Sequence, residues 1–149
     1  MRKWLLPLVL SLAAGAAHAE RFTARVIIVL DGDTVLVVRD CNKGHPEAPG
    51  DRRPSCGDNK PIKIRLAEID APEKEQAGGA ASTQSLSGMV LKKQVNVNVQ
   101  AVDKYKRLVA HLEAEGKNVN KEQVWRGMAW EYSNYHSDKA YIALQDDAR

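Results

Sequence analysis

Aromatic residues are scarce in this chain of 149 residues: they make up 5% of the sequence, with a single Phe. A hydrophobic core must therefore come mostly from Val, Leu and Ile, and such β-branched side chains favour strands. The sequence has 44% hydrophobic and 28% charged residues and shows no internal repeat or low-complexity segment. This composition is typical of one soluble globular domain and excludes a disordered, fibrous or polytopic membrane protein.

The sequence has no apolar run long enough to span a bilayer. Its first 19 residues combine a basic start at Arg2 and Lys3, an apolar run from Trp4 to Ala14 and a small-x-small cleavage site at 17–19. This is the pattern of a secretory signal peptide. An uncleaved membrane anchor is the alternative, but the run falls short of the ~20 residues that a transmembrane helix needs. We therefore predict a signal peptide over residues 1–19, a mature domain over 20–149, a periplasmic or secreted location, and no stable membrane association after cleavage.

A large excess of basic charge is also missing. Without Arg2 and Lys3, 20 basic residues face 19 acidic ones, which leaves a mature net charge of +1. A protein that coats DNA tightly and non-specifically usually carries more positive charge, because its affinity comes from neutralising many phosphates. Transient contact with nucleic acid remains compatible with this balance.

Cysteine is limited to Cys41 and Cys56, separated by fourteen residues rich in Gly, Pro and charge. Export would place both in an oxidising compartment, where a disulfide closing this loop is the natural interpretation. Such a bond would contribute about 3 kcal/mol in the chain-entropy model. A zinc site that includes His45 is the alternative, although two Cys and one His without paired spacing match zinc patterns poorly.

The mature chain has the pattern of a mainly β domain with helices. The runs Phe22 to Leu30 and Thr34 to Arg39 are rich in β-branched residues, and the Asp31-Gly32-Asp33 turn between them is typical of a hairpin. Further expected elements are strands at 61–69, 95–100 and 107–114, a helix at 80–92, a helix with Asn120 and Gln123 as capping box, and a last helix capped by Ser137, with Trp125 and Trp130 packing the last helices. The order predicts an α+β fold, a five-stranded OB-fold barrel with two to three helices.

Charged motifs stand at the ends of three expected strands, at 31–34, 65–73 and 103–107. Asp33 and Asp70 end different strands, where two carboxylates could converge on a hard cation. Calcium and magnesium prefer oxygen ligands, and the chain offers no His/Cys cluster that would favour zinc. The alternative is that each motif is only a turn, a strand end or a solvated face.

In combination and order, the motifs D-G-D-T, R-L-x-x-x-D-x-P-E and D-K-Y-x-R resemble those of the thermonuclease (staphylococcal nuclease-like) family, which hydrolyses DNA and RNA on an OB-fold barrel. The resemblance spans roughly Arg25 to Tyr135. It implies that Asp33 and Asp70 bind Ca²⁺ together with the main-chain carbonyl of Ala71.

The resemblance also implies a set of catalytic residues. Glu73 matches a glutamate to which the family assigns the role of general base, and a carboxylate beside a metal-bound phosphate can take a proton from an attacking water. Arg65 and Arg107 match arginines that flank the scissile phosphate. A guanidinium fork can meet two phosphate oxygens at once, a geometry that lysine does not reproduce.

Substrate contacts are implied at Lys104 and Tyr105, which match phosphate-contacting positions, and at Tyr135, which matches a tyrosine of the base pocket. Two positions depart from the family. Ser133 occupies the slot of a second pocket tyrosine, and Lys106 stands where the family generally has Gly. If that turn needs a positive φ, Lys106 would strain it by about 1 kcal/mol. His111 has no partner pattern and is interpreted as a strand histidine.

The resulting prediction is a secreted, monomeric, calcium-dependent nuclease. It would act on DNA and RNA, preferably single-stranded, without strong sequence preference, and would leave 3′-phosphates. The alternative is a catalytically inactive OB-fold module that only binds nucleic acid. The sequence favours the enzyme because all five residues that the family's chemistry needs are present: Asp33, Arg65, Asp70, Glu73 and Arg107.

Overall fold

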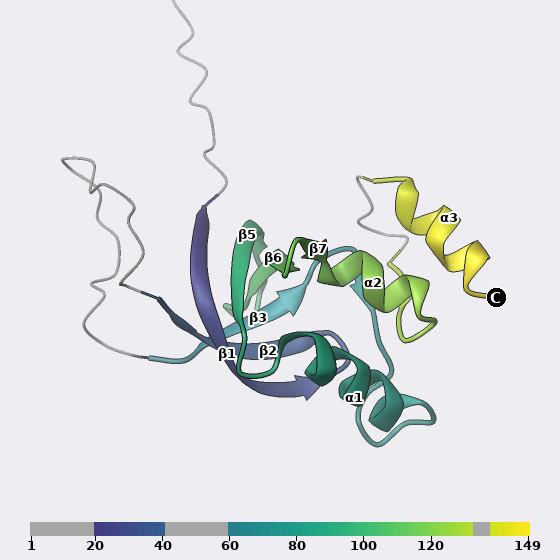
Figure 1. The fold of residues 1–149 in the computed structure, drawn as a ribbon, viewed down its shortest axis with the longest axis horizontal. Helices are drawn as coiled ribbons and strands as arrows, with labels where there is room; N and C mark the ends of the chain where they lie inside the picture. The colour runs from purple at the N-terminus through teal and green to yellow at the C-terminus, as the bar shows by residue number, and fades with distance from the viewer. Residues whose placement is uncertain (1–19, 41–59, 133–137) are drawn as a thin grey trace, which may run out of the picture.

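A computed structural model describes residues 20–40, 60–132 and 138–149 of the chain (Figure 1). Its strands are β1 (Arg21–Asp31), β2 (Thr34–Arg39), β3 (Ile62–Leu66), β4 (Ile69–Asp70), β5 (Gln94–Val102), β6 (Leu108–Ala114), β7 (Lys117–Asn118) and β8 (Trp130–Glu131). Its helices are α1 (Gly79–Val90), α2 (Val119–Trp125) and α3 (Ala140–Asp147). The predicted signal peptide, Cys41, Cys56 and Tyr135 lie outside the described residues, so the disulfide stays a prediction. None of the described helices is long and apolar enough to cross a membrane.

Five strands close into a barrel. The sheet runs in the order β3-β2-β1-β5-β6-β7, and a parallel pairing of β3 with β6 joins its two sides. All other pairings in this sheet are antiparallel. The prediction of an α+β, five-stranded OB-fold barrel with up to three helices is thereby confirmed, and the helices gather on one side of the barrel (Figure 1).

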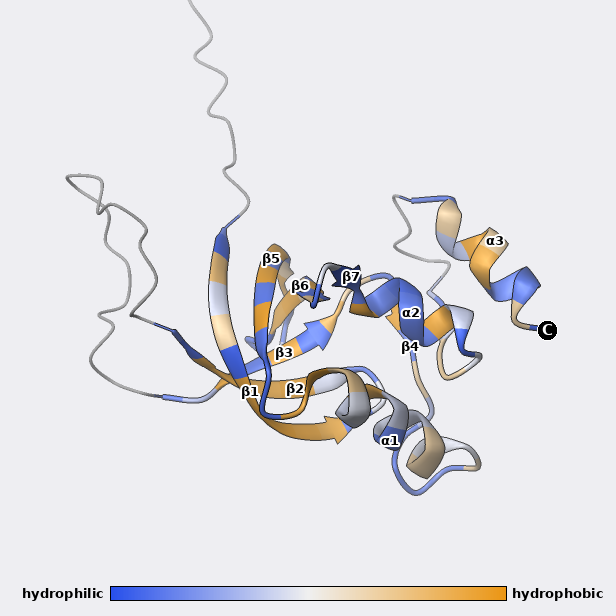
Figure 2. Cartoon of the chain, in the orientation of Figure 1, coloured by the Kyte–Doolittle hydropathy of each residue, from blue (hydrophilic) through white to orange (hydrophobic). Residues whose placement is uncertain are grey.

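The core is aliphatic, as the scarcity of aromatic residues requires. Along β5, Val95, Val97 and Val99 are buried while the polar residues between them face outward, and Figure 2 shows this alternation of hydropathy. Phe22 and Tyr141 are the aromatic members of the core within the described ranges. This period-two burial fixes which side chains of each strand reach the outer surface.

The predicted capping box of α2 was wrong. Asn118 is the N-cap, and its side chain accepts a hydrogen bond from the Lys121 amide at 2.9 Å. Asn120 is instead fully buried: it accepts from the Leu112 amide at 3.0 Å and donates to the carbonyl oxygens of Ala67 and Ala110. The asparagine that looked like a local cap thus ties α2 to the barrel.

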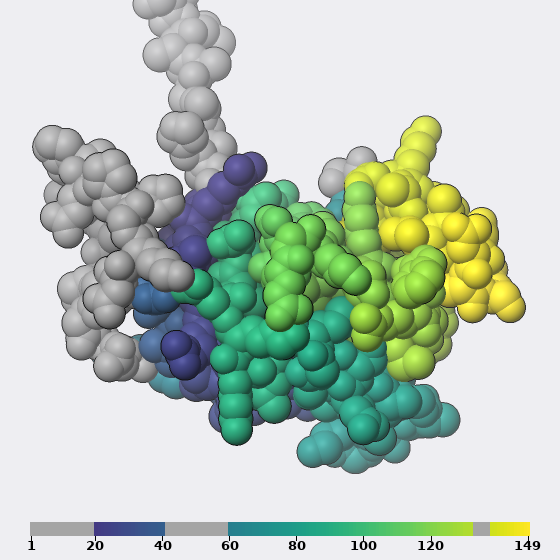
Figure 3. Space-filling model, in the orientation of Figure 1, coloured from purple at the N-terminus to yellow at the C-terminus, as the bar shows by residue number. Residues whose placement is uncertain are grey.

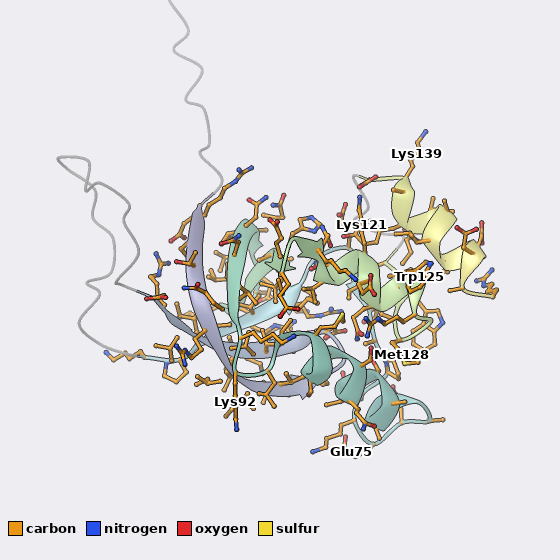
Figure 4. The ribbon with its side chains drawn as sticks, in the orientation of Figure 1. Glu75, Lys92, Lys121, Trp125, Met128 and Lys139 are labelled. Carbon is orange, nitrogen blue, oxygen red and sulfur yellow. The ribbon has the colours of Figure 1, made fainter. Side chains whose placement is uncertain are left out.

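Two further expectations need correction. The strand expected over 61–69 is divided into β3 and β4 by a turn in which Glu68 adopts a φ of 64°. Trp125 and Trp130, which were expected to pack the last helices, are 55% and 54% exposed and lie outside the core. The helix α3 lies against α2, as the yellow and green surfaces of Figure 3 show, and its residue Tyr141 is buried.

Candidate active site

Asp33 is buried at the tip of the β1–β2 hairpin. Its Oδ1 accepts a hydrogen bond from the Thr34 hydroxyl, and its Oδ2 accepts one from the Ala71 amide, both at 2.8 Å. Burial raises the pKa of the Asp33 carboxyl to about 6, although the nearby Arg65 guanidinium acts to lower it. The hairpin sits tightly on α1, because a Cβ at Gly32 would lie 1.8 Å from the Ser82 hydroxyl oxygen.

Arg65 on β3 connects the two predicted metal-binding aspartates. Its Nη1 lies 2.8 Å from Asp33 Oδ2, and its Nη2 lies 2.8 Å from Asp70 Oδ1. Nη1 also donates to the Ile69 carbonyl at 2.9 Å. The structure therefore brings Asp33 and Asp70 together on one guanidinium, although they are far apart in sequence.

The metal ligands predicted from the sequence are all oxygen atoms, which hard cations prefer. Within the described ranges, no cluster of three or more His, Cys, Asp or Glu side chains could hold a metal. The predicted ligands are the carboxylates of Asp33 and Asp70 and the main-chain carbonyl of Ala71. The Ala71 amide donates a hydrogen bond to Asp33, so the backbone of Ala71 lies beside that carboxylate. Such an all-oxygen set suits calcium or magnesium and not zinc.

Glu73 lies in the loop before α1, where its backbone is firmly held. Its amide donates to Gln76 Oε1 at 2.9 Å, and its carbonyl accepts from the Gln76 amide at 2.8 Å. Gly79 packs against the same peptide, since a Cβ there would lie 1.9 Å from the Glu73 carbonyl oxygen. The residue itself is exposed. The predicted base is thus fixed by its backbone and faces solvent.

Asp103 organises the turn that presents Arg107. Its Oδ1 accepts from the amides of Tyr105 and Arg107, and its Oδ2 lies 2.6 Å from Arg107 Nε. Desolvation acts to raise the pKa of Asp103, but these hydrogen bonds from Arg107 and Tyr105 lower it below its ordinary value. Lys106 has a φ of 62°, so the turn does need the left-handed conformation that glycine adopts most easily.

A cavity of about 620 Å³ adjoins these elements. Four predicted residues line it: Arg65, Lys104, Tyr105 and Arg107. The lining does not include Asp33, Asp70, Ala71 or Glu73, so Arg65 is the link between the carboxylate pair and the cavity.

The cavity wall also contains Glu68, His111 and Tyr132, to which the sequence analysis assigned no role in the site. His111 is not an isolated strand histidine, since its Nε2 lies 3.1 Å from Glu68 Oε2. The available signal was the alternation of the strand expected at 107–114, which places positions 107, 109 and 111 on one face. The partner at Glu68 could not be found this way because the sequence predicted an unbroken strand there.

Known proteins similar to this chain include proteins named as nucleases. A family model described as "Staphylococcal nuclease homologue" matches residues 63–149. An "Uncharacterized endonuclease" of Haemophilus influenzae is 39% identical over 134 residues, which are 90% of this chain and 66% of that protein. An "Uncharacterized endonuclease" of Escherichia coli O157:H7 is 37% identical over 150 aligned positions, which cover 100% of this chain and 86% of that relative. A "Micrococcal nuclease" of Shigella flexneri is 32% identical over 76% of this chain and 60% of its own.

The fold, the family model and the nuclease names of the relatives define a nuclease-like OB-fold domain, as predicted. The chain belongs to the staphylococcal nuclease homologue family. It spans 66% of the Haemophilus relative, just under two thirds of that length, and 86% of the Escherichia one.

Proposed function

We propose that this protein is an exported, monomeric, calcium-dependent nuclease that cleaves DNA and RNA without strong sequence preference and prefers single strands. The observation that carries the proposal is the position of the Arg65 guanidinium. It contacts both Asp33 and Asp70 at 2.8 Å, and Arg65 lines the same cavity as Arg107. The endonuclease and micrococcal nuclease names of relatives support the same activity.

The chain's own residues account for the main steps of hydrolysis. Asp33, Asp70 and the Ala71 carbonyl would hold Ca²⁺, which supplies positive charge to the phosphate when bound. Arg65 and Arg107 bind the non-bridging oxygens as negative charge develops on them. Glu73 accepts the proton of the attacking water. The water oxygen bonds to phosphorus, the P–O5′ bond breaks, and the leaving 5′-oxygen takes a proton from solvent, so the other product ends in a 3′-phosphate.

An exposed aromatic ring in the cavity wall supports the proposed preference for single strands. Tyr105 is 68% exposed, and the Arg107 guanidinium carbon lies 5.4 Å from the centre of its ring. Stacking of a base on an exposed ring is tolerant of base identity and needs an unpaired base. The net charge of +1 for residues 20–149 supports weak binding and release of product.

The test uses the full chain, recovered after export. Release of acid-soluble nucleotides from heat-denatured DNA is measured with millimolar calcium and again with chelator. We expect digestion only with calcium, slower digestion of duplex DNA, and new 5′-hydroxyl ends that polynucleotide kinase can phosphorylate. A folded sample that binds DNA but releases no nucleotide in either condition would contradict the proposal and favour a module that only binds nucleic acid.

A further inference from the structure

A chain of hydrogen-bonded side chains extends from the wall of the cavity, and the reaction proposed above does not use it. It begins at Glu68, a buried carboxylate in the turn between β3 and β4. Glu68 Oε2 lies 3.1 Å from His111 Nε2, and His111 Nδ1 lies 3.2 Å from the Tyr141 hydroxyl on α3. Three elements that are distant in sequence thus converge on one imidazole.

These contacts fix the orientation and the proton of the ring. Because a carboxylate only accepts, the neutral ring would donate Nε2–H to Glu68, which leaves Nδ1 to accept from the Tyr141 hydroxyl. Burial lowers the pKa of His111, against the opposing effect of the Glu68 charge, which favours this neutral form. With both nitrogens engaged, the imidazole has no N–H left for a phosphate oxygen. What it offers to a ligand is the exposed part of its ring that is not stacked on Tyr141, whose ring centre lies 6.3 Å away.

The ring lies at the cavity, away from the phosphate-binding end. His111 lines the same cavity as Arg65 and Arg107, and its side chain is 20% exposed. Arg107 directly precedes β6, and His111 stands four residues further along the chain, which is about 13 Å at ~3.3 Å per residue. A phosphate held by the two arginines therefore leaves His111 beside a neighbouring nucleoside.

We propose that His111 is a stacking surface for the base of a nucleotide adjacent to the scissile phosphate, and that Glu68 and Tyr141 are the positioning residues that hold its ring. The assignment rests on the proposed function, because Arg65 and Arg107 define where the scissile phosphate lies. The ligand chemistry is a planar base and not an anion, since the cationic groups of the cavity are Arg65, Lys104 and Arg107.

A matched pair of variants isolates the ring. His111→Leu and His111→Phe both lose the hydrogen bonds to Glu68 and Tyr141, but only Phe keeps an aromatic surface. The substrate is an oligonucleotide with one natural phosphodiester among uncleavable methylphosphonate linkages, made with every base present or with an abasic residue on one side of that bond. Glu113→Ala, two residues further on the same face of β6 and outside the cavity lining, is the control.

The expected result is a rise in KM of between about 5-fold and 100-fold for His111→Leu on the intact substrate, with kcat little changed. His111→Phe recovers most of the wild-type KM, and Glu113→Ala keeps it. If the abasic residue lies on the side of the cleaved bond whose base stacks on His111, it raises the KM of the wild type. The same abasic residue causes no further rise in the KM of His111→Leu.

Three results would overturn the proposal. They are an unchanged KM in His111→Leu, an equal rise in KM in His111→Leu and His111→Phe, or a fall in kcat that is the same on intact and abasic substrates. If the His111 variants do not fold, Tyr141→Phe, which deletes one hydroxyl, must still raise KM through a loosened ring. If the wild type cleaves neither oligonucleotide, the proposed function fails, and fluorescence anisotropy with the same two oligonucleotides still decides whether His111 binds a base.

Discussion

Replacement of Gly79 by alanine tests how the loop before α1 positions Glu73. A Cβ on residue 79 would lie 1.9 Å from the Glu73 carbonyl oxygen, 2.7 Å from its carbonyl carbon and 2.9 Å from the Lys74 carbonyl carbon. These are backbone atoms, which no side-chain rotation can move away. An ordinary contact of 3.4 Å with the oxygen requires a displacement of about 1.5 Å.

Two magnitudes follow from that displacement. Overpacking of this kind costs about 1 to 3 kcal/mol of folding free energy. A catalytic group moved by about 1 Å loses on the order of 100-fold in rate. We therefore expect Gly79→Ala to remain folded at 25 °C, with a lower Tm, and to reduce kcat on heat-denatured DNA by about two orders of magnitude while its affinity for DNA changes little.

Gly88 on the same helix is the matched control. Nothing lies within 4 Å of a Cβ built there. Gly88→Ala should therefore stabilise α1 by about 0.5 to 1 kcal/mol, because alanine has less backbone freedom to lose than glycine, and should keep the wild-type kcat. Thermal unfolding and steady-state digestion are measured on both variants. A folded Gly79→Ala protein with the kcat of Gly88→Ala would refute the claim that this contact positions Glu73.

Three further substitutions test other parts of the site. Glu73→Gln should lower kcat by between about 100-fold and 10,000-fold by removing the proton acceptor, with DNA affinity retained in an anisotropy assay; wild-type turnover would exclude the base. Lys106→Gly should raise the unfolding free energy by about 0.5 to 1 kcal/mol, because relief of the positive φ exceeds the added chain entropy; a lower Tm would contradict this. Asn120→Ala should cost at least about 2 kcal/mol, since it removes the hydrogen-bond partner of the buried Leu112 amide and of the Ala67 carbonyl, whereas Asn118→Ala should cost about 1 kcal/mol for a lost cap; equal losses in urea unfolding would show that the two asparagines do not differ.

Much of the barrel could be predicted from local pattern. The run Thr34 to Arg39 forms β2 with the expected bounds, and the turn before it carries Asp33 as expected. Both features depend on neighbours in sequence: β-branched residues favour strands, and Asp-Gly favours the turn between them. At Lys106 the family resemblance raised a positive φ only as a condition, and the turn does adopt one.

The errors arose where distant contacts determine the conformation. Asn120 and Gln123 match a local capping box, yet Gln123 Nε2 donates to the carbonyl of Gly32, which is 91 residues away. Glu68 lies in an alternating apolar pattern, yet it adopts a positive φ and bonds His111. A pattern of spacing describes one segment at a time, so it cannot report a partner that another segment supplies.

Arg65→Lys tests the central claim most directly, because Arg65 is the residue that joins the carboxylate pair to the cavity. Lysine keeps the positive charge but cannot contact Asp33, Asp70 and a phosphate with a planar fork. Turnover of heat-denatured DNA in saturating calcium is measured beside the wild type, with circular dichroism as the check on folding. The account predicts a loss of about 100-fold or more in kcat from a folded protein, equivalent to about 3 kcal/mol of transition-state stabilisation. A folded Arg65→Lys protein with wild-type turnover would contradict the assignment of this site.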